Sequence, residues 1–358
     1  MITKNTQITF AEAADLWLEA IEPEVKLSTQ VRYINLLNTY LLPEFGALSV
    51  SVITREQVNA FRLRSLKTGG EQGTGLSPRT LSALLSVFRR IMDYARLELG
   101  YSAEDIRNVA LKQIQKPLRV FSYSEQLKLS TYLMQNTSLT DFGILIALYM
   151  GLRIGEICAL RWEDISIEDR SLRVNHTLQR IQTFQDRPHT RIIITSPKSL
   201  CSIREIPIPS SLQPLFQELK KNDDCFVLTG FSDRFIEPRT MENRFKRVLQ
   251  ICGISEATFH TCRHTFATRC IELGFDIKSL SEILGHASVN ITMNRYVHPS
   301  IEFKRKNMNR LSVFLQNPKP ICSETVISIN DKFKKDGNKL KNLGVITKES
   351  DTGFEGNH

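Results

Sequence analysis

The chain has 358 residues and 41% of them are hydrophobic, which is enough for two domains that each bury a core. Its net charge of +9 and its pI of about 9.2 favour an acidic partner, most simply nucleic acid. Seven cysteines without paired spacing argue against a disulfide framework. The longest apolar run, FGILIALYMGL, is too short for a membrane span. A cytoplasmic protein without a membrane partner is therefore predicted.

Residues 1–112 are predicted to form an almost entirely helical domain. Apolar residues recur at helical spacing in three segments, 9–21, 28–45 and 77–99. Ser28 is the expected N-cap of the second segment, and Pro78 suits the start of the third. One apolar stripe of the third helix consists of Leu81, Leu84, Leu85, Phe88, Ile91, Met92 and Ala95. The Gly-rich segment 66–80 is predicted to be a loop.

Charge is distributed unevenly within this first domain. Residues 1–56 carry four lysines and arginines against seven acids, whereas residues 57–112 carry nine against five. The candidate DNA-contacting cations of the second stretch are Arg62, Arg64, Lys67, Arg79, Arg89, Arg90 and Arg96. They form either a solvated helical surface or a basic face that follows a phosphate backbone.

A linker at 113–121 is predicted to lead into a second domain, 122–316, whose first helix opens with the capping-box pair Ser122 and Glu125. Further helices are expected at 141–150, 154–162, 240–253 and 300–316, and strands at 170–178, 190–200 and 203–209. The chain is therefore predicted to be mainly α-helical, with a small antiparallel β-sheet in the second domain. The polar, Lys-rich tail 317–358 has few core-forming residues.

Two short stretches of the second domain place cations at turns. In GLRIGEICALRW, Gly151 and Gly155 permit tight backbone geometry around Arg153, which stands at a helix start and could bind a phosphate or pair with Glu156. In TSPKSLCSIREIPIP, Lys198 lies between two strand-like segments and is expected to project from a hairpin turn. Taken alone, it could be an ordinary solvated lysine.

Two further stretches carry histidines and a tyrosine. In FHTCRHTFATRC, His260 and Arg263 share a helix face, and the spacing of His260 and His264 would suit a metal, but no third ligand is evident. In SEILGHASVNITMNRYVH, Gly285 is expected to end a helix just before His286, and Tyr296 follows on the next helix. Each residue, taken alone, could be structural.

In this order, six positions resemble the active-site set of the tyrosine recombinases, the phage integrase family: Arg153, Lys198, His260, Arg263, His286 and Tyr296. The flanking phrases GLRIGEICALRW, HTCRHTFAT and LGHASVNITMNRYVH are similar to those of that family, and the resemblance covers about residues 7–316. It implies a helical core-binding domain joined to an α+β catalytic domain. It also implies cleavage and rejoining of DNA strands through a covalent 3′-phosphotyrosyl intermediate, without metal or cofactor.

The resemblance assigns a role to each residue of the set. Tyr296 would be the nucleophile, and Arg153, Arg263 and His286 would bind the phosphate oxygens as charge develops on them. A phenol is a weak nucleophile at neutral pH, so a proton acceptor is needed, and His260 is the expected one. Lys198, on a mobile hairpin, would protonate the leaving 5′-oxygen. Glu156 is expected to orient Arg153, and His264 is expected to be structural.

The expected partners are double-stranded DNA attachment sites, three further copies of the chain in a tetramer, and DNA-bending or excisionase proteins. The C-terminal helix 300–316 would pack onto a neighbouring copy. The protein would be bacterial or phage-encoded and would lie on the nucleoid.

We favour the integrase of a mobile element or phage, because the tail departs from the compact plan of the Xer dimer resolvases. The first domain begins so near Met1 that no separate arm-binding domain is expected before it. A Xer-type resolvase, a catalytically idle DNA-binding regulator and a metal-dependent nuclease are the alternatives.

Overall fold

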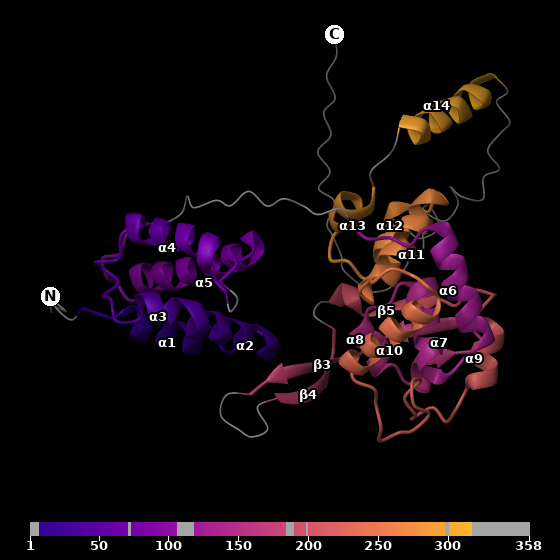
Figure 1. Cartoon of the computed structure of the whole chain (residues 1–358), viewed down its shortest axis with the longest axis horizontal. Coiled ribbons are helices and arrows are strands. Elements are labelled where there is room, and N and C mark those ends of the chain that lie inside the picture. Colours follow the sequence, from indigo (N-terminus) through magenta and orange to yellow (C-terminus); the bar gives the residue numbers. More distant parts are fainter. Residues whose placement is uncertain are drawn as a thin grey trace, which may run out of the picture. The chain divides into compact units, whose positions relative to one another are not determined.

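The structure is a computed structural model that describes residues 7–70, 73–105, 118–183, 190–197, 200–297 and 301–316 (Figure 1). The chain divides into two compact units, Met1–Val297 and His298–His358. Helix α14 (Ile301–Gln316) is the described part of the second unit. Most of the predicted linker and all of the tail 317–358 lie outside the described residues. Within the described residues, no helix is long and apolar enough to cross a membrane.

The N-terminal part of the first unit is helical, as predicted. Its elements are α1 (Phe10–Ile21), α2 (Leu27–Leu36), the π-helical turn Leu37–Leu41, α3 (Leu42–Phe45), α4 (Arg55–Thr68) and α5 (Pro78–Leu97). The prediction that Ser28 caps α2 is wrong, because Lys26 takes the extended N-cap conformation and the helix already begins at Leu27. Helix α4 was not predicted. Its signal was the capping box formed by Thr54 and Gln57, whose side chains each bond the other's backbone N–H.

This part has its own hydrophobic core, built around aromatic rings. Phe88 of α5 stacks on Phe10 of α1 at 5.1 Å between ring centroids and lies 4.9 Å from Phe45 of α3. Phe61 of α4 meets the edge of Phe45 at 5.3 Å. The whole predicted stripe of α5 is buried, and Ser77 caps that helix ahead of Pro78. The apolar spacing in the sequence therefore identified the face that packs inward.

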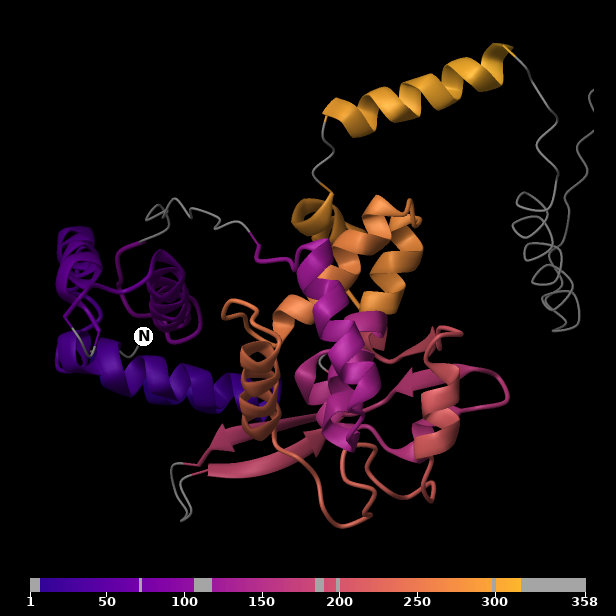
Figure 2. The same cartoon turned by 45° about the vertical axis from the view of Figure 1, so that its right-hand side comes forward.

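The remainder of the first unit mixes helices with two small antiparallel sheets (Figures 1 and 2). The helices are α6 (Tyr123–Gln135), α7 (Leu139–Met150), α8 (Ile154–Ala159), α9 (Gln213–Leu219), α10 (Pro238–Ile251), α11 (His260–Glu272), α12 (Ile277–Leu284) and α13 (Val289–Tyr296), with short 3₁₀ turns at Trp162–Asp164 and Leu200–Ser202. The strands are β1 (Ile165–Ser166), β2 (Ser171–Val174), β3 (Thr177–Gln182), β4 (Thr190–Thr195) and β5 (Arg204–Pro207). One sheet has the order β1-β2-β5, and β3 pairs with β4 in the other.

The pairing corrects two sequence-based expectations. The segment 170–178 was predicted as one strand, but it divides into β2 and β3, which belong to different sheets. Strands β4 and β5 do not pair with each other, since β4 pairs with β3 and β5 pairs with β2. The two strands therefore do not form the hairpin that was expected around Lys198, and Lys198 itself lies outside the described residues. Strand pairing is a long-range property, which a local pattern does not specify.

Helix α7 forms the centre of the larger core. Apart from its first two residues, it is buried along nearly its whole length, as expected for a helix that is apolar on all sides. Phe142 of this helix packs against Phe216 of α9 at 4.7 Å between ring centroids and stacks with Trp162 at 6.5 Å. Figures 1 and 2 show α11, α12 and α13 lying together beside this core. The candidate catalytic residues that the structure describes come from this helical group and from the turn that follows α7.

Candidate active site

The turn after α7 places Arg153 at the start of α8. Gly151 ends α7 in the left-handed conformation, with φ +71°, and its Cα faces the ring of Phe266 so closely that a Cβ would lie 2.5 Å from it. Arg153 is the N-cap of α8, as predicted, and its Nη2 donates to the carbonyl of Gly285 at 3.3 Å. Gly155 lets α8 approach β3, because a Cβ there would lie 2.8 Å from the carbonyl oxygen of Leu178. The glycines expected to allow tight geometry do so here.

Glu156 holds Arg153 together with a second arginine that the sequence had not indicated. Nη1 of Arg153 donates to Glu156 at 2.7 Å, and the Arg153 backbone N–H donates to the same carboxylate at 2.9 Å. Arg204 of β5 donates to both carboxylate oxygens, at 3.1 and 2.9 Å. Burial alone would raise the pKa of Glu156, but the hydrogen bonds and charge of Arg204, with a smaller contribution from Arg153, lower it to about 2. Glu156 is therefore an ionised orienting group, as expected.

Arg263 is almost completely buried, at 1% exposed, and is fixed by backbone carbonyls. Its Nη1 donates to the carbonyl of Gly151 at 2.8 Å, and its Nη2 donates to that of Leu284 at 2.6 Å. Burial lowers the pKa of Arg263 to about 9, and the charge of Arg153 acts in the same direction. A guanidinium with that pKa is still protonated at neutral pH. The guanidiniums of Arg153 and Arg263 thus both reach the end of α12, where they bond the carbonyls of Gly285 and Leu284.

His286 lies directly after α12, where Gly285 forms the predicted left-handed C-cap with φ +64°. Its Nε2 is 3.0 Å from Nη2 of Arg263, and its Nδ1 is 2.8 Å from Oγ1 of Thr292. A guanidinium nitrogen can only donate, so Nε2 accepts and the ring proton sits on Nδ1. Burial, followed by the charge of Arg263, lowers the pKa of His286 to about 3, so the ring is neutral. To donate to a phosphate oxygen, this ring must change its hydrogen-bond partners or its tautomer.

Tyr296 ends α13 and faces this cluster. It is only 6% exposed, and its ring lies parallel to that of His286 at 6.3 Å between centroids. Its hydroxyl oxygen is 2.9 Å from Nδ1 of His264. Burial raises the pKa of Tyr296 above its usual value of 10, and the nearby cations Arg263 and Arg295 offset only part of this rise. The phenol is therefore protonated at neutral pH.

His260 stands at the first position of α11 and keeps an exposed surface. Its ring meets the ring of His264 edge-on at 4.5 Å between centroids. Burial, followed by the neighbouring His264 and the charge of Arg263, lowers the pKa of His260 to about 4. The histidine that the structure places in hydrogen-bond contact with Tyr296 is His264, which was expected to be structural.

The structure thus brings five of the six predicted catalytic residues into one region, and the sixth, Lys198, lies outside the described residues. The chain of contacts runs from Arg153 through Gly285 to His286, and Arg263 touches His286 directly. Among the described residues, no group of histidine, cysteine and carboxylate side chains is arranged to hold a metal ion.

The predicted DNA-contacting cations lie on two neighbouring helices. Arg62, Arg64 and Lys67 are on α4, and Arg79, Arg89, Arg90 and Arg96 are on α5. Two of them form ion pairs, Arg64 with Glu44 and Arg96 with Asp93. The first pair is exposed and therefore weak, so Arg64 is readily available to a phosphate, whereas the second pair is half-buried.

Three residues that contact the predicted set had not been indicated as part of it. His264 follows Arg263 directly, and Thr292 lies one helical turn before Tyr296, so their neighbours in the chain were the only signal. Arg204 had a clearer signal, because it alternates with Ile206 along β5 and shares its buried face. A cation on the inward face of a strand needs a buried acceptor, which here is Glu156.

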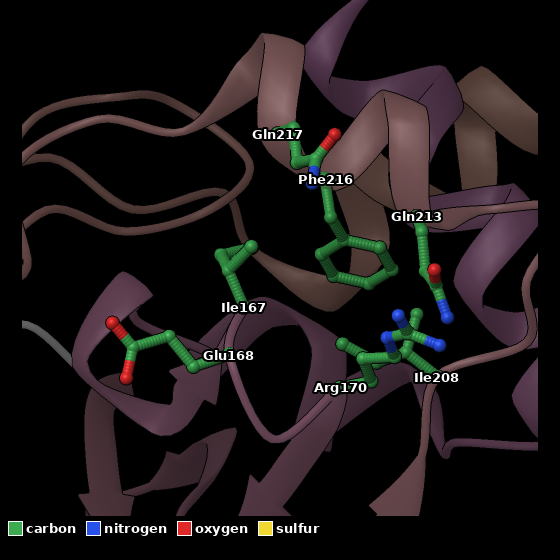
Figure 3. Close-up of a pocket in the computed structure, with 7 residues that line it drawn as sticks. All are labelled: Ile167, Glu168, Arg170, Ile208, Gln213, Phe216 and Gln217. Carbon is green, nitrogen blue, oxygen red and sulfur yellow. The ribbon is translucent and has the colours of Figure 1, made fainter.

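A separate pocket of about 340 Å³ lies between α9 and the turn that joins β1 to β2 (Figure 3). Its lining residues are Ile167, Glu168, Arg170, Ile208, Gln213, Phe216 and Gln217. Figure 3 shows the side chains of Arg170 and Gln213 on one side and Glu168 extending away from them. None of the five predicted catalytic residues that the structure describes lines this pocket, so it is separate from the cluster around Tyr296.

A mainly helical fold that gathers two arginines and two neutral histidines around one buried tyrosine is that of a tyrosine-type site-specific recombinase. The chain belongs to the phage integrase family: the family model of that description matches residues 107–302, and the model for the N-terminal SAM-like domain of phage integrases matches residues 9–64. The predicted family and fold class are confirmed.

Two relatives illustrate the range of this similarity. A "Tyrosine recombinase XerC-like" protein of Caldanaerobacter subterraneus subsp. tengcongensis is 27% identical over 319 residues, which cover 81% of this chain and 79% of the relative. The ICEBs1 integrase of Bacillus subtilis is 24% identical over 308 residues, which cover 82% of this chain and 80% of the relative.

Solved structures share the fold at low sequence identity. The Tn1549 transposon integrase in complex with transposon right-end DNA has a TM-score of 0.68 and 21% identity, and the match covers 85% of this chain and all of that one. A lambda integrase tetramer bound to a Holliday junction has a TM-score of 0.59 and 16% identity, over 83% of this chain and 80% of that one.

Proposed function

We propose that this recombinase integrates and excises a mobile element or phage by cutting and rejoining DNA at attachment sites. What supports the mobile-element assignment is the similarity to the ICEBs1 integrase along four-fifths of both chains. The observation that carries the chemistry is the convergence on Tyr296: His286 lies parallel to its ring and is bonded in turn to Arg263. This arrangement sets a nucleophilic oxygen beside groups that bind anions.

In the proposed reaction, the hydroxyl oxygen of Tyr296 attacks phosphorus and displaces the 5′-oxygen, which leaves the 3′ end of the strand on the tyrosine. Arg153 and Arg263 bind the non-bridging oxygens, where negative charge grows in the transition state. Both guanidiniums are already fixed by carbonyls or by Glu156, so little reorganisation is needed when the phosphate arrives. His286 is proposed to join them through Nε2, once this nitrogen takes up the ring proton and exchanges Arg263 for the phosphate, while Nδ1 keeps its bond to Thr292.

The leaving 5′-oxygen needs a proton as it departs, and we propose Lys198 as its source. The phosphotyrosyl bond retains the energy of the phosphodiester, so a free 5′-hydroxyl of a second strand can reverse the step without ATP. The proton of the phenol needs an acceptor, and two neutral imidazoles, those of His260 and His264, lie on α11.

We also propose a division of labour along the chain. Residues 1–112 would bind DNA as a core-type domain, using the cations of α4 and α5, residues 113–121 would be the linker, and residues 122–316 would carry the catalytic domain. The active form would be a homotetramer on two DNA sites, in which α14 docks on a neighbouring copy. Apolar side chains exposed on the described helix support this: Met308, Leu311, Val313, Phe314 and Leu315. DNA-bending or excisionase proteins would assist, in the cytoplasm at the nucleoid.

The test uses a nicked suicide duplex that carries the element's attachment site, on which cleavage traps the covalent adduct. We expect an adduct that resists SDS and EDTA and is absent with Tyr296→Phe. An adduct formed by the Tyr296→Phe protein would remove the nucleophile assignment, and loss of activity in EDTA would indicate a metal-dependent nuclease. DNA binding without any adduct would indicate an idle regulator.

A Xer-type dimer resolvase is the second candidate, because the relative in Caldanaerobacter subterraneus is named XerC-like. The two functions differ in the DNA that they recombine. Excision of a flanked element from a plasmid supports the first candidate, and resolution of a chromosomal or plasmid dimer site supports the second.

A further inference from the structure

The hydroxyl of Tyr296, the proposed nucleophile, is in hydrogen-bond contact with His264, and Arg263 also interacts with it. The hydroxyl oxygen and Nδ1 lie 2.9 Å apart, and the two ring centroids lie 5.7 Å apart. His264 follows Arg263 on α11, and successive helical residues point about 100° apart. Arg263 therefore reaches the carbonyls of Gly151 and Leu284, while His264 faces α13.

We infer that His264, rather than His260, accepts the phenolic proton when Tyr296 attacks DNA. This inference rests on the proposed function of Tyr296 and deepens it. No hydrogen bond joins His260 to Tyr296 in the part of the chain that the structure describes, and the ring of His260 instead contacts that of His264. His264 is a catalytic residue in this reading, because it touches the reacting oxygen.

Burial restricts where the proton can go. Tyr296 is 6% exposed and His264 is 8% exposed, so bulk water has little access to the hydroxyl. A proton that leaves this oxygen therefore passes to a protein group that is already hydrogen-bonded to the hydroxyl, because a general base acts at hydrogen-bond distance. Nδ1 of His264 meets that condition when the ring carries its own proton on Nε2.

The charges around His264 make its basicity depend on DNA. Arg263 and His260 face it from α11, Arg295 and Tyr296 face it from α13, and His286 lies across the ring of Tyr296. Burial, then the charges of Arg295 and Arg263, lower the pKa of His264 to about 4 in the DNA-free protein. A bound phosphodiester brings negative charge to these arginines and so raises the basicity of the imidazole. The base is therefore weak until the substrate is in place.

The O–H bond of Tyr296 breaks and its proton moves to Nδ1 of His264, while the phenolic oxygen forms a bond to phosphorus. The bond from phosphorus to the 5′-oxygen breaks, and that oxygen takes a proton from Lys198. When the strand is rejoined, His264 returns its proton to the phenolic oxygen as the leaving group.

The test compares His264→Asn with His260→Asn, the same substitution one helical turn away. An asparagine amide can still hydrogen-bond near the position of Nδ1, but it is not a base. Single-turnover adduct formation is measured on the suicide duplex with either oxygen or sulfur at the bridging 5′ position. A thiolate leaves without protonation, so sulfur rescues a missing acid but not a missing base.

We expect His264→Asn to slow adduct formation by on the order of 10²- to 10⁴-fold on both substrates, and His260→Asn to have a clearly smaller effect. Lys198→Ala should recover on the sulfur substrate. The inference is overturned if His264→Asn cleaves as fast as the unaltered protein or faster, which would make the bond a resting tether. It is also overturned if sulfur rescues His264→Asn, or if His260→Asn shows the larger loss.

Two measurements remain decisive if His264→Asn does not fold, as judged by its melting temperature and DNA affinity. Nitrogen-15 NMR of the full-length unaltered protein should show His264 with its proton on Nε2 and Nδ1 as an acceptor, and a proton on Nδ1 would contradict the inference. In a folded His264→Gln protein, fluorotyrosine at position 296 should cleave DNA faster than tyrosine does, because the more acidic phenol loses its proton more easily without a base. An unchanged rate would count against proton acceptance by His264.

The outcomes separate this inference from the proposed function. An adduct that persists in Tyr296→Phe removes the nucleophile, and with it both proposals. An adduct that needs Tyr296 but is indifferent to His264 removes only the inference drawn here.

Discussion

Replacing Glu156 by glutamine tests whether the arginines of the site depend on one buried carboxylate. The substitution keeps the shape of the side chain and removes its charge. Arg204 is 8% exposed and would lose its ionised partner, and the 2.7 Å hydrogen bond of Arg153 would lose the negative charge of its acceptor. The change therefore acts on stability through Arg204 and on the reaction through Arg153.

The expected magnitude follows from the ionisation of Glu156. Its pKa falls from 4.5 to about 2 in the folded protein. At 1.36 kcal/mol for each pKa unit, this shift corresponds to about 3 kcal/mol of stabilisation at neutral pH. Breaking a buried ion pair by removing one partner costs about 3–5 kcal/mol by comparison, so Glu156→Gln should destabilise by about 3 kcal/mol.

The lowered pKa of Glu156 also predicts that the stability of the protein depends on pH. Because the folded-state pKa is the lower one, the contribution of Glu156 is complete above about pH 4.5 and is lost as the pH falls toward 2. The difference in stability between the unaltered protein and Glu156→Gln should therefore shrink over this interval and stay constant above it.

The assay is urea unfolding followed by circular dichroism, with covalent adduct formation measured in parallel. The matched control is Glu125→Gln. A hydrogen bond from Arg119 lowers the pKa of Glu125 to about 2 as well, but the Arg119 side chain is 39% exposed. Solvent screens such a pair, so the control should lose less than about 1 kcal/mol. Glutamine also keeps the capping box at Ser122.

Equal losses in the two variants would refute the argument, because burial would then not distinguish the two pairs. A Glu156→Gln protein that is as stable as the unaltered one at pH 7 would refute it as well. If stability falls but adduct formation does not, Arg153 does not need Glu156 for its orientation.

Three further substitutions probe neighbouring features. Thr292→Val keeps the shape of the side chain but removes the hydrogen-bond partner of Nδ1 of His286. The rate of adduct formation should fall several-fold at unchanged DNA affinity, which corresponds to about 1 kcal/mol of activation free energy. Gly151→Ala forces a side chain into the left-handed region and against the ring of Phe266, so unfolding midpoints should drop by the equivalent of about 2 kcal/mol. Lys67→Ala removes an exposed cation of α4, so the slope of log affinity against log salt concentration should fall by about 0.9.

Each of these expectations has a result that contradicts it. Full activity in Thr292→Val would mean that His286 is oriented without this bond. A Gly151→Ala protein of normal stability would mean that α7 can end without a left-handed residue. An unchanged salt slope in Lys67→Ala would place α4 away from the DNA backbone, and Glu98→Ala, an acid-to-alanine change at the C-cap of α5, is the comparison for non-specific effects of charge.

Local sequence determined the elements whose causes are local. The stripe of α5, the capping box of α6 at Ser122 and the helix-ending Gly285 were predicted, and Gly151 was expected to allow a tight turn, because spacing, capping and backbone freedom act over a few residues. The family and its candidate residues also followed from motifs that stand in a fixed order along the chain.

Only the tertiary structure decided which groups meet. Packing places β2 and β3 in different sheets, although they follow each other closely in the chain. It also brings Arg204 to Glu156 and His264 to Tyr296, and the residues of each pair lie tens of positions apart. Such pairings depend on how whole elements pack, and a one-residue change of register or a rotation of one helix would replace them. The sequence therefore predicted five residues that the structure brings together, Arg153, His260, Arg263, His286 and Tyr296, and packing determined that His264 is the histidine bonded to the tyrosine.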